Sequence, residues 1–151
     1  MLSIGDKAPE FTLPDSKGSP VQLKDFRGKN VVLYFYPRDS TPGCTKEACS
    51  FNDALASIHK KGATVLGVSA DSVESHRKFA DKHGLQFQLL SDPEKNVIKA
   101  YGVWQKKSLY GRTFMGIVRT TFVIDAKGKI RAVFPKVRVE GHVEEILQSL
   151  E

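Results

Sequence analysis

The chain has 151 residues, of which 40% are hydrophobic and 26% charged, and its formal net charge is +6. This length and composition suit one globular domain, and no apolar run is long enough to span a membrane. We therefore expect a single domain over residues 1–151. The N-terminal residues lack the basic and apolar regions of a signal peptide, which predicts a cytoplasmic protein.

The positive charge has two interpretations. An acidic partner or a nucleic acid would explain it functionally, whereas lysines and arginines on a solvated surface would explain it without any partner. The basic residues are scattered, with no block of five or six like charges and no zinc-finger or RNA-recognition motif. We therefore favour a solvated surface and expect no nucleic-acid partner.

The first half of the chain alternates strand and helix patterns. Residues 11–23 predict two short strands around a turn that contains Pro, Gly and Ser. Residues 30–36 carry six consecutive apolar side chains, which favours a strand buried on both faces. A helix is predicted over residues 44–58, with Gly62 after it. Its apolar face is formed by Ala48, Phe51, Leu55 and Ile58.

The second half continues the alternation and ends in a hairpin and a helix. Asp71 or Ser72 can cap a helix that Gly84 would end. The other predicted elements are a strand at 64–68, a short strand at 87–90, a short helix after the turn 91–94, two strands at 120–124 and 130–134, and a closing helix at 140–150.

This order of elements predicts an α/β protein. We expect a thioredoxin-like fold, with a mixed central sheet flanked by helices and an N-terminal β-hairpin. In such sheets the active site lies at the carboxyl ends of strands, and Cys44 follows the strand that ends near Tyr36. Residues 106–116 fit two interpretations: the rim of a substrate entrance, or a hairpin packed on the core.

Cys44 is predicted to lie at the start of a helix. The reactive form of cysteine is the thiolate, and a free thiol has a pKa of about 8.5. A helix N-terminus carries roughly half a positive charge and several unpaired N–H groups, so this position favours a thiolate. Pro42 suits the first helical turn. Thr41 can cap the helix, or its hydroxyl can hydrogen-bond the sulfur or an oxygen bound beside it.

Cys49 follows five residues after Cys44 on the same predicted helix. In an intact helix this spacing puts the two Cα atoms roughly 8–9 Å apart. A disulfide requires Cα atoms within about 7 Å of each other. If these two cysteines react with each other, the first turns of the helix must unwind.

Other kinds of cysteine chemistry fit this sequence poorly. The two cysteines are too few for a plant-type iron–sulfur cluster, and their spacing is not the Cys-x-x-Cys of thioredoxins. A zinc site would need two of four scattered histidines, namely His59, His76, His83 and His142. Two buried, inert cysteines are the remaining alternative. We expect neither a metal nor a cofactor.

The residues around Cys44 resemble a known family. Pro37, Thr41 and Cys44 form the pattern Pro-x-x-x-Thr-x-x-Cys, which is similar to the signature of peroxiredoxins. The longer string 41–49 resembles that of the bacterioferritin comigratory protein subfamily, also called the Q type. The resemblance extends over nearly the whole chain, including residues 5–13, 101–104 and 119–125.

This resemblance implies a thiol peroxidase that reduces hydrogen peroxide and organic hydroperoxides. Cys44 would attack the peroxide and become a sulfenic acid, and Cys49 would resolve it to an intramolecular disulfide. Pro37 would shield the site, and Thr41 would hydrogen-bond the peroxide. Arg119 would stabilise the thiolate and the developing charge, although composition alone would make it a surface strand residue.

The resemblance also implies the partners of the reaction. The substrate would be a hydroperoxide, and thioredoxin or a related dithiol protein would be the reductant. The chain would act as a monomer. The lack of a membrane-spanning apolar run separately predicts no membrane partner. Two alternatives stay open: a redox sensor that uses the same disulfide to change shape, and a thioredoxin-like disulfide reductase.

Overall fold

A five-stranded mixed sheet forms the centre of the computed structural model, which describes residues 2–151. The strand order is β5-β4-β3-β8-β9. The strands are β3 (Asn30–Phe35), β4 (Ala63–Ser69), β5 (Gln88–Ser91), β8 (Thr120–Ile124) and β9 (Ile130–Phe134). β3, β4 and β5 are parallel, whereas β8 is antiparallel to β3 and β9 to β8. The predicted mixed α/β sheet is confirmed.

The central strand β3 is buried on both faces, as its unbroken apolar run predicts. Side chains of a strand alternate between the two faces, so its odd- and even-numbered residues enter two different core clusters. Tyr34 lies opposite Gly67 of β4. A Cβ atom at Gly67 would lie 2.8 Å from Cζ of Tyr34 and 2.9 Å from Cδ2 of Leu89, so only glycine leaves room for this ring.

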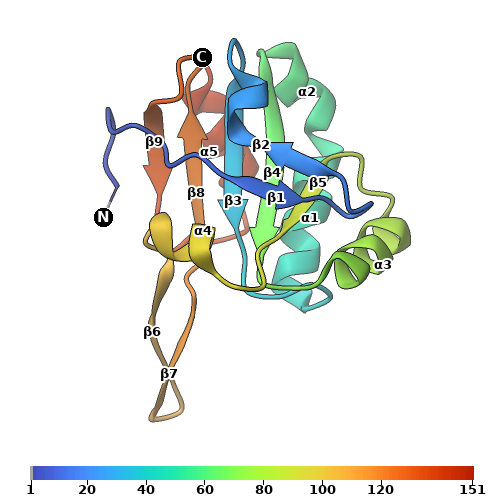
Figure 1. Cartoon of the computed structure of the whole chain (residues 1–151), viewed down its shortest axis with the longest axis vertical. Helices are drawn as coiled ribbons and strands as arrows, with labels where there is room; N and C mark the ends of the chain where they lie inside the picture. Colours follow the sequence, from blue (N-terminus) through green and yellow to red (C-terminus); the bar gives the residue numbers. More distant parts are fainter. Residues whose placement is uncertain (1) are drawn as a thin grey trace.

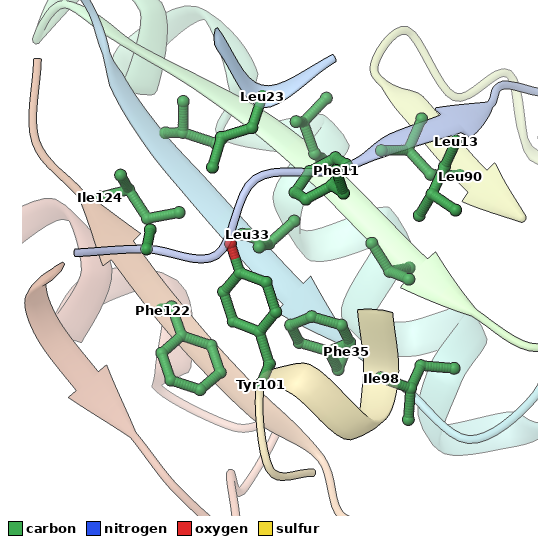
Figure 2. Packing of buried hydrophobic residues seen from close by; sticks show 14 of the residues in the cluster. Phe11, Leu13, Leu23, Leu33, Phe35, Leu90, Ile98, Tyr101, Phe122 and Ile124 are labelled. Carbon is green, nitrogen blue, oxygen red and sulfur yellow. The ribbon is translucent and has the colours of Figure 1, made fainter. Parts of the chain in front are cut away.

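The N-terminal segment and a short helix cover one face of the sheet. These elements are β1 (Thr12–Pro14), β2 (Pro20–Gln22), the 3₁₀ helix η1 (Leu23–Phe26) and α4 (Asn96–Ala100). β1 and β2 pair as the predicted hairpin and cross in front of the sheet (Figure 1). The ring of Tyr101 packs among Phe35 and Phe122 beneath them (Figure 2). Its hydroxyl donates a hydrogen bond to the carbonyl of Pro9 at 2.7 Å, which ties the N-terminal segment to α4.

The other helices pack on the opposite face. They are α1 (Pro42–Asp53), α2 (Leu55–Lys60), α3 (Val73–His83) and α5 (His142–Ser149). Ser72 caps α3 by accepting a hydrogen bond from the backbone N–H of Ser75 at 3.1 Å, which confirms one of the two predicted caps. α1, α2 and α5 lie behind the sheet in the view of Figure 1.

Two predicted helices have different bounds in the structure. The helix expected over residues 44–58 begins at Pro42 and is divided, because Ala54 leaves the helical range with φ −94° and ψ 2°. Its predicted apolar face is nevertheless buried, since Ala48, Phe51, Leu55 and Ile58 all enter the core. α5 starts at His142 instead of residue 140, because Gly141 before it has a left-handed backbone with φ 77°.

A second hairpin was absent from the predicted order of elements. Its strands are β6 (Trp104–Leu109) and β7 (Arg112–Ile117), which form a separate two-stranded sheet. The hairpin projects away from the body of the molecule (Figure 1), and Tyr110 at its turn is 96% exposed. Residues 106–116 are therefore a hairpin, as one interpretation proposed, but most of it is not packed on the core. None of the described helices has the length and hydropathy needed to cross a membrane.

Candidate active site

Cys44 is the third residue of α1, and its side chain is almost completely buried. The loop after β3 leads directly into this helix, so the sulfur lies at the carboxyl end of the central strand, as predicted. Pro42 occupies the first helical position, and Thr41 precedes it with an extended backbone. The first backbone N–H groups of α1 have no carbonyl partner inside the helix, so this end favours negative charge on the sulfur.

Arg119 brings a positive charge to the same place. It directly precedes β8, and Thr120 pairs with Phe35 at the end of β3, so the sheet register carries Arg119 to the site. Its Nη2 donates a hydrogen bond to Sγ of Cys44 at 3.3 Å. A Cβ atom at Gly43 would lie 3.3 Å from this nitrogen, so glycine leaves space for the guanidinium. Arg119 is therefore not the exposed strand residue that composition alone suggests.

Glu47 is a member of the site that the sequence analysis missed. Its Oε1 accepts a hydrogen bond from Nη1 of Arg119 at 2.6 Å, so the guanidinium bridges the carboxylate and the sulfur. The side chain of Glu47 is 2% exposed, and Oε2 has no hydrogen-bond partner within residues 2–151. Burial raises the pKa of Glu47 to about 7, against the lowering effect of Arg119. The available signal was an acidic residue on the buried face of α1, one turn after Cys44.

Arg119 stays charged in this environment. Burial opposes the charge, but the nearby Glu47 and Cys44 outweigh it and raise the pKa of Arg119 further. A guanidinium is planar and can donate along two parallel directions, which suits a bridge between two acceptors. The hydrogen bond to Glu47 thus helps to fix the guanidinium of Arg119 relative to Cys44.

The loop over residues 37–41 carries the other two predicted site residues. Pro37 follows β3 and is half-buried. The hydroxyl of Thr41 donates a hydrogen bond to the carbonyl of Arg38 at 3.0 Å and makes no capping bond to α1. The predicted cap is therefore wrong at the level of the side chain, because this hydroxyl is directed into its own loop. The oxygen of Thr41 still has lone pairs that can accept a hydrogen bond from a bound molecule.

A buried hydrogen-bond network fixes this loop from beneath. Nδ1 of His76 lies 2.7 Å from a carboxylate oxygen of Asp39, and the hydroxyl of Tyr36 donates to the other oxygen at 2.6 Å. Nε2 of His76 lies 3.0 Å from the carbonyl oxygen of Leu90, which can only accept. Nε2 is therefore the donor to Leu90, and Nδ1 faces the carboxylate of Asp39. The backbone N–H of Asp39 also donates to Asp71 at 2.8 Å.

The same cluster resembles a metal site in composition only. Asp39, Asp71 and His76 each place a potential ligand atom within 4.8 Å of the others. Hydrogen bonds within the cluster and to the backbone already occupy these atoms. Neither cysteine belongs to the cluster. We therefore assign it a structural part in holding residues 37–41.

Cys49 lies further along α1 and is half-buried, and both cysteines are free thiols. The helix is continuous between them. Regular helix geometry keeps their Cα atoms roughly 8–9 Å apart, beyond the reach of a disulfide. The two thiols can therefore bond only if this part of α1 opens.

Comparison with known proteins agrees with the resemblance to peroxiredoxins. A model of the AhpC/TSA family matches residues 4–133. A protein called bcp from Coxiella burnetii is 51% identical over 149 residues and covers 99% of both chains. Peroxiredoxin Bcp from Bacillus subtilis is 48% identical and covers 99% of this chain and 95% of its own. The solved structure of Xanthomonas campestris bacterioferritin comigratory protein has a TM-score of 0.91 at 39% identity, covering 99% and 96% of the two chains.

The chain belongs to the AhpC/TSA family. Its relatives and structural neighbours are peroxiredoxins of the Bcp or Q type, so it is a thiol peroxidase of that group that reduces hydroperoxides at the expense of a reductant. The expected thioredoxin-like fold is likewise confirmed by these neighbours.

Proposed function

We propose that Cys44 is the residue that reacts with the hydroperoxide. Its thiolate attacks the terminal oxygen, the O–O bond breaks, and an alcohol or water leaves after taking up a proton. The sulfur becomes a sulfenic acid, the first oxidation state of a thiol. The observation that supports this assignment best is the hydrogen bond of Arg119 to Sγ of Cys44 at the first turn of α1.

Arg119 and Thr41 would contact different groups during the reaction. Arg119 would stabilise negative charge, and Thr41 would bind the O–H of the peroxide. The guanidinium stabilises the thiolate before attack and the negative charge that moves onto the peroxide oxygens during attack. The hydroxyl of Thr41 donates to the carbonyl of Arg38, which leaves its oxygen able to accept a hydrogen bond from the O–H of the peroxide. Pro37, half-buried beside this loop, would limit the access of water.

Cys49 would then resolve the sulfenic acid. Its sulfur attacks Sγ of Cys44, a disulfide forms, and the sulfenic oxygen leaves as water. This step requires α1 to open between the two cysteines, which also separates Glu47 from Arg119. A dithiol protein would return both thiols to the reduced state by exchange, and thioredoxin is the reductant that we propose.

The resolving thiol belongs to the same chain, so a monomer suffices for the cycle. Because the cycle needs reduced cysteines, a reducing compartment such as the cytoplasm suits it. Alkyl hydroperoxides join hydrogen peroxide as proposed substrates, since alkyl peroxide reduction is named for the Xanthomonas protein.

A coupled turnover assay tests this proposal. The purified chain is given hydrogen peroxide or an alkyl hydroperoxide, with thioredoxin, thioredoxin reductase and NADPH. We expect Cys44→Ser to abolish peroxide consumption, and Cys49→Ser to consume one equivalent and then stop. Normal cycling of Cys49→Ser would show that an outside thiol resolves the sulfenic acid. Peroxide consumption by Cys44→Ser would overturn the assignment of the reacting residue.

A further inference from the structure

The β6–β7 hairpin carries most of the large hydrophobic side chains that are exposed in the described part of the chain. Five large hydrophobic residues are exposed within residues 2–151, and four of them lie on this hairpin. They are Leu109, Tyr110, Phe114 and Met115. Exposed apolar residues that cluster on a projecting element commonly mark a surface that binds a partner.

The charged residues in the sequence around this tip are all basic. From residue 95 to residue 124 the sequence contains six cationic residues and no acidic one. The six are Lys95, Lys99, Lys106, Lys107, Arg112 and Arg119. Because Arg119 is already paired with Glu47, the attraction of an anionic partner depends on the other five cations.

The apolar groups lie on both faces of the hairpin. Paired residues of an antiparallel ribbon share a face, so Leu109, Arg112, Lys107 and Phe114 lie on one side. Lys106 and Met115 are paired on the other side, together with the exposed Ser108–Thr113 pair. A protein partner usually covers a single face, whereas the boundary layer of a lipid bilayer surrounds an inserted tip from all sides.

We propose that the β6–β7 hairpin docks on anionic lipid surfaces, with Leu109 and Tyr110 in the headgroup layer and the flanking lysines and arginines on lipid phosphates. Aromatic side chains with a polar end suit this layer, and each nearby cation adds to the attraction of an anionic membrane. The ribbon keeps two unpaired edges, so the insertion stays at the interface and does not reach the hydrocarbon core. The expectation of no membrane partner considered only membrane-spanning segments.

The base of the hairpin reaches the active site. Lys107 packs over Gly116, and burial lowers its pKa, with Arg119 lowering it further and Cys44 opposing this. β7 ends at Ile117, and Arg119, which donates to Cys44, follows two residues later. At about 3.4 Å per residue, Tyr110 lies only roughly 10 Å from Lys107 along the strand. A docked hairpin would thus hold the reactive thiol close to the lipid surface.

Vesicle sedimentation tests the proposal without any activity measurement. The probes are vesicles of equal parts phosphatidylglycerol and phosphatidylcholine, compared with pure phosphatidylcholine. We expect the wild type to bind the anionic vesicles, to lose this binding at high salt, and to bind the neutral vesicles weakly. The double variant Leu109→Thr/Tyr110→Asn should bind at least about tenfold less. Asn suits the left-handed backbone of Tyr110, with φ 51°, so the turn is kept.

A charge series separates this site from unspecific attraction to a basic protein. Lys106→Gln/Arg112→Gln should lower the partition coefficient by about 30-fold. The control Lys60→Gln/Lys127→Gln removes the same charge from exposed positions outside the hairpin and should lower it much less. Equal losses in both pairs would overturn the proposal.

Two further outcomes would also overturn it. The tip variant could slow turnover with a protein reductant while vesicles bind neither protein, which would make the hairpin a protein-docking site. Alternatively, the wild type could sediment as a dimer that the tip variant dissociates, and the tip would then bind a second copy of the chain. Unchanged circular dichroism and hydrogen peroxide turnover would show that the variants fold.

Discussion

At the residue scale, the site depends on how one guanidinium is shared. Arg119 donates to Sγ of Cys44 at 3.3 Å and to Oε1 of Glu47 at 2.6 Å. Glu47 fixes its direction, and the first turn of α1 adds a second source of positive potential. Donors held in place before the reaction cost no reorganisation during it, so small displacements of this group should be visible in the rate.

Replacing Arg119 by alanine tests this arrangement. We expect the second-order rate constant for hydrogen peroxide to fall by about 10² to 10³, because both the thiolate and the developing oxygen charge lose their cation. The rate constant of Arg119→Lys should lie between those of wild type and Arg119→Ala, since one ammonium cannot bridge both acceptors. Stopped-flow measurement of the first turnover gives the rate. Arg77→Ala, at an exposed position, is the control; an Arg119→Ala rate equal to it would remove Arg119 from the reaction.

Glu47 should make stability depend on pH. Its pKa is raised from 4.5 to about 7 by burial, so the native state holds this proton more tightly than the unfolded state does. Stability from this group is therefore complete below pH 4.5 and is lost as the pH rises to 7. We expect wild type to lose roughly 3 kcal/mol relative to Glu47→Gln across this range.

Urea unfolding at a series of pH values measures this difference. The control is Glu144→Gln, which removes an exposed carboxylate from α5. Parallel stability curves for wild type and Glu47→Gln between pH 4.5 and 7 would show that Glu47 titrates normally.

At the element scale, α1 and the loop before it have different supports. α1 is held by its apolar face on the sheet, whereas residues 37–41 are held by the buried pair of His76 and Asp39. This pair reaches from α3 to the loop that carries Thr41. Removing one member of a buried pair leaves the other charge without compensation.

We expect His76→Gln to destabilise the fold by about 3 kcal/mol, because one amide cannot bond both Asp39 and the carbonyl of Leu90 as the imidazole does. Peroxide turnover should fall as well, since the loop loses its support. His59→Gln, at an exposed histidine, is the control. If His76→Gln unfolds at the same urea concentration as this control, the pair does not support the loop.

At acid pH, the free energy of unfolding depends on the ionisation of Asp39. Burial alone would raise its pKa, but the hydrogen bonds and charge of His76, with those of Tyr36 and Ser75, outweigh it and lower the pKa. The stabilisation is therefore present above the unfolded value of 3.8 and is lost as the pH falls through the lower native value. The stability difference between wild type and His76→Gln should shrink in this acid range, and a constant difference would contradict the lowered pKa.

Local patterns predicted the regular elements well. The apolar run of β3, the turn between β8 and β9 and the cap at Ser72 depend on neighbouring residues only, and the structure has all three. The roles of Glu47 and His76 were missed because their partners, Arg119 and Asp39, are distant in the sequence. The β6–β7 hairpin was only one of two interpretations of residues 106–116, because most of it is exposed and no core-facing alternation marks its strands.

At the scale of the whole molecule, the core determines the free energy of unfolding, and the exposed end of the hairpin contributes little to it. Phe122 is fully buried in the cluster of Figure 2, whereas Tyr110 is 96% exposed. We expect Phe122→Ala to cost about 3–5 kcal/mol of unfolding free energy and Tyr110→Asn less than about 0.5 kcal/mol. Urea unfolding gives both values. A large loss in Tyr110→Asn would mean that the hairpin supports the fold.

The packing of α1 on the sheet decides how much of the molecule must move when the two thiols react. α1 packs its apolar face on the sheet through Ala48 and Phe51, and Phe51 follows Cys49 in the chain. Opening the first turns therefore leaves the later part of α1 anchored. The cycle thus needs only a local rearrangement, with the sheet unchanged.

Hydrogen exchange before and after one equivalent of hydroperoxide tests the central claim most directly, with the intact mass read on the same sample. The account predicts that the oxidised chain loses two hydrogen atoms, yields a peptide pair linked through Cys44 and Cys49, and loses amide protection over residues 42–49 while β3 stays protected. A linked pair with unchanged protection over 42–49, or an oxidised chain without that link, would contradict it.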